Sequence, residues 1–133
     1  MIAAMKPLLR GLLLLAVCGT AEAAQLSLTE AENGKDLWMN RGDRLVIRLS
    51  ANPSTGYDWI YSATKSGMLR QEGKVAREVR TSEKGMVGAP VTEVWTLKAL
   101  RAGSLSIIFS YARPWEKGVP PARSIFWTVT IRC

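Results

Sequence analysis

The chain has 133 residues, 18 basic and 11 acidic side chains, a net charge of +7 and no histidine. This length suits one domain with a modest core, and the absence of histidine removes the commonest general base, the Ser–His and Cys–His nucleophile pairs and most zinc sites. The composition therefore argues against an enzyme, and neither a metal nor a cofactor is expected.

The N-terminal segment has the three-part layout of a secretory signal peptide. Lys6 and Arg10 precede an apolar run over residues 12–17, and the small-residue site Ala21-Glu22-Ala23 follows. The run is too short to span a bilayer, which takes about 20 apolar residues. We expect a signal peptide over residues 1–23, a mature domain over residues 24–133 with no membrane span, and export to the periplasm or the medium.

A lipid anchor on Cys18 is the alternative for this segment. The fit is poor, because the residue before a lipidated cysteine is normally small and here it is Val17. Cleavage after Ala23 would leave Cys133 as the only cysteine of the mature chain, so no internal disulfide bond is expected there.

Beyond the signal, apolar residues alternate with polar ones, which is typical of half-buried strands. The alternating positions are Leu26 and Leu28; Leu45, Ile47 and Leu49; Trp95, Leu97 and Ala99; Leu105, Ile107, Phe109 and Tyr111; Ile125, Trp127, Val129 and Ile131. Residues 66–84 are polar and predict an exposed pair of strands or one irregular strand. Seven to eight short strands separated by Gly and Pro turns predict an all-β antiparallel sandwich or barrel.

The segment Asn52-Pro-Ser-Thr-Gly-Tyr57 is more restricted than a simple connection needs. Pro53 fixes one φ angle, Gly56 permits a sharp reversal, and the hydroxyls of Ser54 and Thr55 can bond to nearby backbone. Taken alone, such a cluster is most often an ordinary turn. The pattern predicts a stiff, protruding turn.

Two further loops stand out. Arg113-Pro-Trp115 directly follows the strand that ends at Tyr111, and it predicts an aromatic that is either exposed for binding or folded back over the core. Gly85-Met-Val-Gly-Ala-Pro90 combines flexible glycines with apolar Met86 and Val87, and by itself it indicates only a loop.

Together the three segments resemble the motifs of the chagasin family, inhibitors of cysteine peptidases. Residues 52–57 resemble its Asn-Pro-[Ser/Thr]-Thr-Gly-[Tyr/Phe] motif, Gly88-Ala-Pro90 resembles its glycine-rich second motif, and Arg113-Pro-Trp115 resembles its third. Val91 departs from the pattern, because a glycine often stands there. The order and spacing also match over the whole mature domain.

The resemblance implies an immunoglobulin-like sandwich that inserts the three motifs, as loops at one end, into the cleft of a papain-type cysteine peptidase. It implies reversible inhibition by a monomer without a cofactor. Residues 52–56 would meet the catalytic centre, residues 85–90 the non-primed side and residues 113–115 the primed side. The peptidase-binding residues would be Asn52, Pro53, Ser54, Thr55, Gly56, Tyr57, Gly85, Met86, Val87, Gly88, Ala89, Pro90, Arg113, Pro114 and Trp115, while Trp59, Trp95 and Trp127 would be core.

Three other functions agree less well with the sequence. A carbohydrate-binding or other envelope ligand-binding sandwich could use Trp115 and Tyr111, but it gives no reason for the stiff turn at residues 52–56. An enzyme would rely on carboxylates such as Asp58, Glu93 and Glu116, which are scattered. Nucleic-acid binding is not expected, because the basic residues form no stripe with interleaved aromatics.

Overall fold

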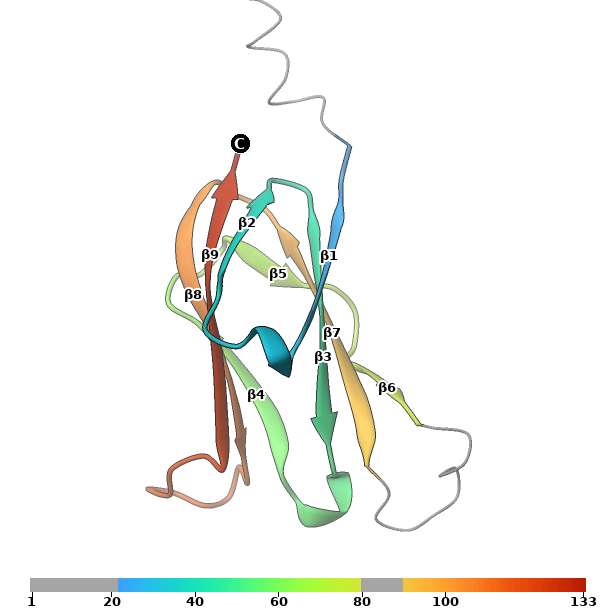
Figure 1. Ribbon diagram of the computed structural model, residues 1–133. Helices are drawn as coiled ribbons and strands as arrows, with labels where there is room; N and C mark the ends of the chain where they lie inside the picture. The colour runs from blue at the N-terminus through green and yellow to red at the C-terminus, as the bar shows by residue number, and fades with distance from the viewer. Residues whose placement is uncertain (1–21, 80–89) are drawn as a thin grey trace, which may run out of the picture.

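The computed structural model describes residues 22–79 and 90–133. These residues form nine strands and two single-turn 3-10 helices (Figure 1). The elements are β1 (Gln25–Thr29), η2 (Glu30–Glu32), β2 (Asp36–Asn40), β3 (Arg44–Ala51), η3 (Pro53–Thr55), β4 (Asp58–Ala63), β5 (Leu69–Gln71), β6 (Ala76–Glu78), β7 (Val91–Ala99), β8 (Gly103–Ala112) and β9 (Arg123–Arg132).

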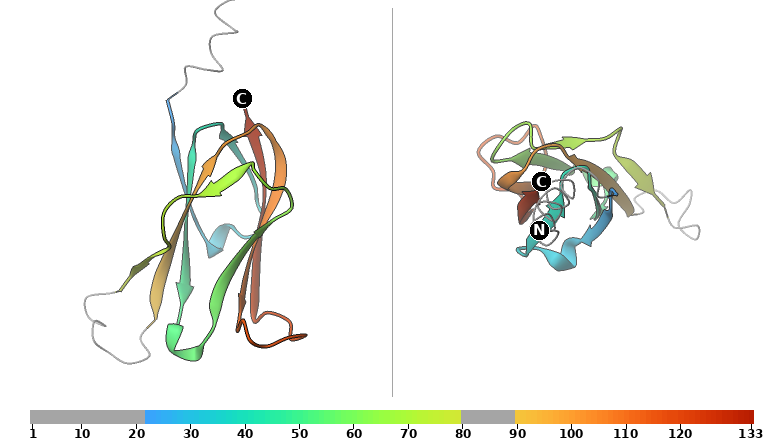
Figure 2. Two further views of the ribbon diagram at one scale, coloured as in Figure 1. Left: turned by 180° about the vertical axis from the view of Figure 1, so that it is seen from behind. Right: turned by 90° about the horizontal axis from the view of Figure 1, so that it is seen from above.

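The strands form two sheets that face each other along the long axis of the molecule (Figure 2). One sheet has the order β1-β3-β7-β5, with β6 also paired to β7, and the other has the order β2-β9-β8-β4. The prediction of an all-β, immunoglobulin-like sandwich is therefore confirmed.

Two details differ from the prediction. The described residues hold nine strands instead of seven to eight, and the pairs β1–β3 and β2–β9 are parallel. The parallel pairs arise because the chain crosses from one sheet to the other between β1 and β2, so both strands run beside later strands of the same direction. Alternation within a strand shows which face is buried and says nothing of the neighbour's direction.

The core lies between the sheets and is built from the alternating positions. The side chains of Leu45, Ile47, Leu49, Leu97, Ile107, Phe109, Trp127 and Val129 are completely buried. Trp59 and Trp95 are also buried, with 4% and 7% of their surface exposed. The prediction that Trp59, Trp95 and Trp127 belong to the core is confirmed.

The polar segment after residue 66 contains β5 and β6, two short strands that both pair with β7. All three residues of β6 are exposed, as the sequence predicted for this region up to residue 79. Residues 80–84 lie outside the described part of the chain.

In the structure of the full chain, Cys133 is disulfide-bonded. The expectation of no internal disulfide bond concerns the chain cleaved after Ala23, and it stays a prediction. Within residues 22–79 and 90–133, no helix has the length and apolarity needed to traverse a bilayer.

Candidate functional site

The connection between β3 and β4 is a tight turn over residues 52–57. Asn52 is extended, Pro53–Thr55 form the 3-10 turn η3, and Gly56 has a φ of 81°. The Thr55 and Gly56 amides donate to the carbonyls of Asn52 and Pro53 at 3.2 and 3.1 Å. The Thr55 hydroxyl donates to the same Asn52 carbonyl at 2.7 Å, and the Ser54 hydroxyl donates to Asn52 Oδ1 at 2.6 Å. The predicted turn is confirmed, and these hydrogen bonds restrict its backbone.

Tyr111, near the end of β8, contacts this turn from the adjoining sheet. Its hydroxyl accepts a hydrogen bond from the Asn52 amide at 2.9 Å. Its ring stacks on Tyr57 with centroids 5.2 Å apart and an interplanar angle of 20°, and it lies 4.8 Å from the Trp59 ring. The turn thus packs on aromatic rings, two of which, Trp59 and Tyr111, belong to strands of one sheet.

Arg123, at the start of β9, packs against two of these aromatic rings. Its guanidinium lies over the rings of Trp59 and Tyr111, at 4.9 and 4.8 Å from their centroids. It also donates to the Ser50 carbonyl at 2.8 Å and pairs with Glu30 at 2.9 Å. Arg123 could not be identified from the sequence, because nothing in its local sequence distinguishes it from other surface arginines.

The loop after β8 carries the Arg113-Pro-Trp115 motif, and its arginine is directed at the neighbouring turn. Arg113 Nε donates to the Thr55 carbonyl at 3.1 Å. The guanidinium also lies 4.4 Å from the centroid of the Tyr57 ring and 3.7 Å from the Glu116 carboxylate. Arg113 therefore fastens the loop to the turn.

Trp115 is exposed over 66% of its surface, which decides between the two alternatives left open by the sequence. Its ring does not lie on the core; it lies against the backbone of Gly56. A Cβ atom at Gly56 would collide with the ring at Cη2, and it would lie 3.1 Å from Cζ2 and 3.4 Å from Cζ3. Glycine at position 56 thus permits both the positive φ angle and the close approach of the Trp115 ring.

The second motif falls mostly outside the described residues: Gly85, Met86, Val87, Gly88 and Ala89 are not described, and Pro90 is. Pro90 directly precedes β7, whose first residue, Val91, is paired with Ala51. Glu78 of β6 is paired with Thr92. Both flanks of the segment are therefore at the same end of the sandwich as Asn52 (Figure 1).

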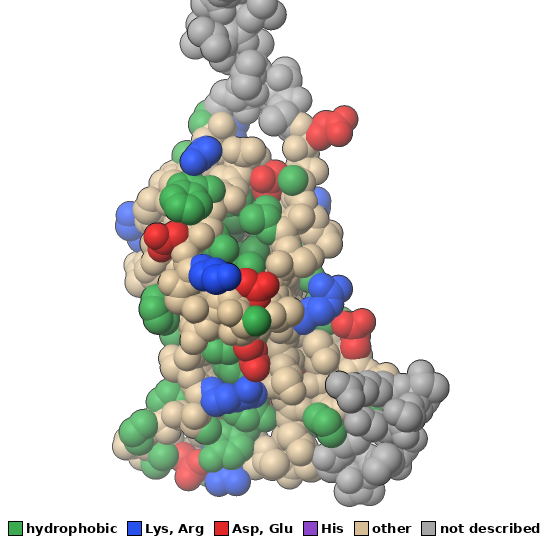
Figure 3. Space-filling view, viewed as in Figure 1, with side chains coloured by type: hydrophobic (Ala, Val, Ile, Leu, Met, Phe, Trp, Pro, Cys, Tyr) green, Lys and Arg blue, Asp and Glu red, His purple; other side chains and the backbone are tan. Residues whose placement is uncertain are grey.

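We use the term loop end for the turn at residues 52–57, the loop at residues 113–120 and the flanking residues Val79 and Pro90. Hydrophobic side chains gather at this end over the β8–β9 connection (Figure 3). Trp115, Val119 and Val79 are exposed there over 66%, 55% and 47% of their surface. A mixed apolar and backbone surface of this kind is suited to contact with another protein.

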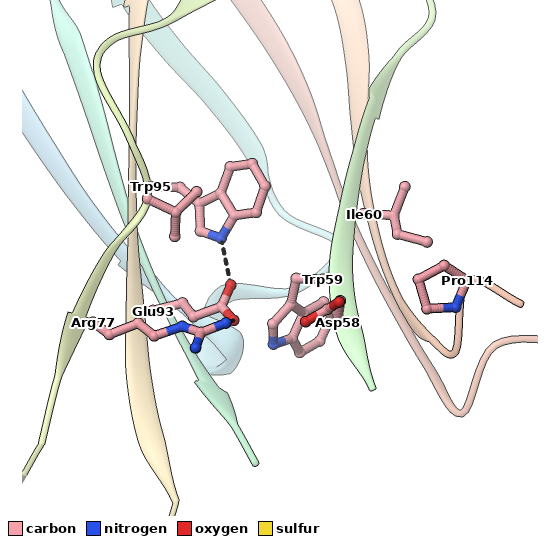
Figure 4. Close-up of a pocket in the computed structure, with 8 residues that line it drawn as sticks. Asp58, Trp59, Ile60, Arg77, Glu93, Trp95 and Pro114 are labelled. Carbon is pink, nitrogen blue, oxygen red and sulfur yellow. Dashed lines mark hydrogen bonds and ion pairs between the residues drawn. The ribbon is translucent and has the colours of Figure 1, made fainter. Parts of the chain in front are cut away.

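Beside the loop end, a shallow pocket between β7 and β4 holds the buried carboxylate of Glu93 (Figure 4). Burial raises the pKa of Glu93, against the lowering effects of a 3.3 Å hydrogen bond from Trp95 Nε1 and of Arg77 at 3.8 Å. Asp58 adds a smaller raising effect. Through its ion pair with Arg77, Glu93 thus links β7 to β6. In residues 22–79 and 90–133, no group of three or more acidic or cysteine side chains could hold a metal ion.

The structure does not support the carbohydrate-binding alternative. It requires Tyr111 and Trp115 as exposed aromatics, yet Tyr111 is only 8% exposed and its hydroxyl is bonded to Asn52. The catalytic alternative is also not supported, because Glu93 is a buried structural carboxylate.

A β-sandwich that presents linked loops at one end is an arrangement typical of binding proteins. The family model described as "Chagasin family peptidase inhibitor I42" matches residues 39–131. The chain belongs to this family of peptidase inhibitors. The resemblance seen in the sequence is confirmed, and so is the prediction of an inhibitor in place of an enzyme.

Amoebiasin-2 from Entamoeba histolytica is 37% identical over 116 residues, covering 87% of this chain and 93% of the relative. Chagasin from Trypanosoma cruzi is 29% identical over 89 residues, covering 66% of this chain and 81% of the relative. The crystal structure of the cysteine protease inhibitor EhICP2 from Entamoeba histolytica superposes with a TM-score of 0.75 at 35% identity, covering 84% and 99% of the two chains.

Proposed function

We propose that this protein inhibits papain-type cysteine peptidases reversibly, as a monomer, by placing its loop end in the active-site cleft. The observation that carries the proposal is the fastening of the turn to the loop, through Arg113 on Thr55 and Trp115 on Gly56. The similar EhICP2 is described as a cysteine protease inhibitor. The turn would occupy the catalytic centre, with residues 85–90 and 113–115 on either side of it.

The turn resists cleavage because its carbonyls are already engaged. Peptide hydrolysis needs the scissile carbonyl carbon near the attacking thiolate and its oxygen in the oxyanion hole. The carbonyls of Asn52, Pro53 and Thr55 accept hydrogen bonds from within the protein. Rotating any of them into an oxyanion hole would break these bonds, so the turn fills the site while remaining intact.

Preordered loops should also favour tight binding. Loops that are already ordered lose little conformational entropy on docking, and an interface of about 800 Å² on each partner can then support nanomolar affinity. Trp115 supplies an exposed aromatic of the type that dominates such interfaces. The serine peptidases present a differently shaped site and would not be inhibited.

The N-terminal pattern supports a second part of the proposal, which concerns location. We propose that residues 1–23 direct export and are removed, so that the inhibitor acts in the periplasm or the medium. The lipid anchor on Cys18 remains the alternative, and it would place the same domain on the cell envelope.

Titration of papain with the purified, exported protein tests the function. We expect a stoichiometric loss of activity that is recovered on dilution, with trypsin as an unaffected control. Mass spectrometry after long incubation should find the inhibitor uncut. Full papain activity at micromolar protein, or cleavage between Asn52 and Gly56, would contradict the proposal.

A further inference from the structure

The turn between β2 and β3 contains a buried carboxylate with both oxygens engaged. Asp43 is 3% exposed. Its Oδ1 accepts a hydrogen bond from the Ala24 amide at 2.8 Å, and its Oδ2 accepts one from the Asn40 amide at 2.9 Å. Its own amide donates to the Asn40 carbonyl at 3.0 Å, and its carbonyl accepts from Ala99 at 2.9 Å. The carboxylate is therefore held in place by the turn and by β7.

Ala24 is held equally firmly. Besides the bond from its nitrogen to Asp43, its carbonyl accepts a hydrogen bond from the Arg44 amide at 2.9 Å, and β1 begins at the next residue. The two preceding residues, Glu22 and Ala23, are exposed. Ala24 is also the residue that follows the small-residue site in the sequence. The backbone nitrogen that the proposed cleavage would release thus already donates to a buried carboxylate.

We propose that cleavage between Ala23 and Ala24 creates an α-ammonium group that forms an internal ion pair with Asp43. In this hydrolysis by a signal peptidase, water gives its hydroxyl to the Ala23 carbonyl carbon and a proton to the Ala24 nitrogen. The new amine takes a second proton from solvent at neutral pH. The proposal rests on the export proposed above and is independent of the inhibitory activity.

The geometry suits a charged nitrogen without rearrangement. The 2.8 Å distance between Ala24 N and Asp43 Oδ1 is already that of a charge-assisted hydrogen bond. Ala24 is exposed, so the other ammonium hydrogens can reach water, while the buried carboxylate strengthens the attraction. Processing therefore adds a charge to an existing bond, and the mature domain is more stable than the chain that still carries an amide at this position.

The charged groups on the surrounding elements must be separated from this effect. They lie on the preceding segment, the turn, β3, the β5–β6 connection, β7 and β9, and they are Glu22, Arg41, Arg44, Glu72, Lys98 and Arg132. The Arg44 guanidinium is engaged by Glu72 at 2.7 Å. All except Glu22 are present in every form of the cleaved chain, so a comparison between cleaved forms cancels them.

The test uses the full chain, expressed with its own signal in an exporting bacterium and purified from the periplasm or the medium. Intact mass should give a chain that begins at Ala24. Its α-amino group is then acetylated selectively at mildly acidic pH, with peptide mapping to show that the lysines are unmodified. The acetylated chain has the same residues and lacks only the ammonium charge.

At pH 7 we expect acetylation to lower the melting temperature by about 3 to 6 °C, as for a partly exposed ion pair in a domain of this size. Pairing raises the pKa of the α-amino group above its usual value of about 8. The difference should therefore be complete below about pH 7.5 and disappear as the pH rises through the raised value.

Two variants provide the controls. Asp43→Asn should abolish the effect of acetylation, whereas Asp36→Asn, which changes an exposed carboxylate on β2, should leave it unchanged. If Asp43→Asn does not fold, the acetylation experiment on the unsubstituted chain still decides. A chain that begins elsewhere than Ala24, or acetylation without a change in melting temperature, would overturn the inference.

Discussion

Gly56 meets two requirements at once, and a substitution there tests the loop end at the scale of one residue. Gly56→Val should weaken inhibition, because a β-branched residue at a φ of 81° is strained by about 1 to 3 kcal/mol and its Cβ would displace the Trp115 ring. Inhibition constants and melting temperatures should be measured together.

Gly73→Val is the matched control, because Gly73 has a φ of 66° with no atom near its added Cβ and lies between β5 and β6. It should share the backbone strain and leave inhibition unchanged. Equal inhibition by the Gly56→Val and unsubstituted proteins would argue against a central role for the turn.

Trp115 offers the second test at this scale. Since its ring is largely exposed and lies on Gly56 and not on the core, Trp115→Ala should cost about 2 to 4 kcal/mol of affinity for papain with little change in melting temperature. Trp38→Ala, on a tryptophan that is 54% exposed on β2, should alter neither. A large fall in melting temperature with normal inhibition by the folded protein would refute the anchor role.

At the scale of elements, β8 controls the turn through a single hydroxyl. Tyr111→Phe removes the 2.9 Å hydrogen bond to the Asn52 amide but keeps the stacked ring. We expect a loss of about 1 kcal/mol in stability and a measurable weakening of papain inhibition. Tyr61→Phe changes the corresponding hydroxyl on β4, nearer the middle of the sandwich, and inhibition should stay normal. Identical behaviour of the two variants in both assays would show that Tyr111 does not position the turn.

The burial of Glu93 beside the paired strands β6 and β7 should make the free energy of unfolding depend on pH. Because burial raises the pKa of Glu93 in the folded state, the native protein holds its proton to higher pH than the unfolded chain. Its contribution to stability is then present below the usual glutamate pKa of about 4.3 and is lost as the pH rises through the raised value. Glu93→Gln keeps an oxygen acceptor for Trp95 and cannot ionise.

The melting temperature of Glu93→Gln minus that of the unsubstituted protein should therefore increase as the pH rises from about 4 towards neutrality. Thermal unfolding followed by circular dichroism at a series of pH values measures this difference. A difference that stays constant across the series would mean that burial does not hold the proton on Glu93.

The elements also differ in how far they could be predicted. Strands such as β3 and β9 were predicted because their alternating aliphatic residues must be buried on one face. β2 and β4 are not predicted, since each has a single buried residue, Met39 and Trp59, and one buried position shows no period. The turn at residues 52–57 was predicted because proline and glycine restrict the backbone locally.

The contacts that complete the loop end could not be predicted in the same way. Arg113 and Thr55 are 58 positions apart, so their hydrogen bond follows from how the sheets bring β4 and β8 together. The contact between Trp115 and Gly56 has the same origin. Sequence patterns fix local conformation, whereas contacts between loops depend on the assembled sandwich.

At the scale of the whole molecule, the loop end lies at one pole, and both the start of β1 and the C-terminus lie at the other (Figure 1). The distance between the poles is spanned by long strands such as β8 and β9. An attachment at either terminus is thus separated from the loops by the length of the sandwich.

This polarity suits the protein to display on a solid support. Coupled to a biosensor chip through a tag placed after Cys133, the domain should capture papain as efficiently as it does in solution, because its loops would point away from the surface. Coupling through a cysteine introduced at Val119, inside the loop end, in a chain that also carries Cys133→Ser, should abolish capture. Surface plasmon resonance with the two orientations would distinguish them, and equal capture by both would place the peptidase-binding surface elsewhere on the molecule.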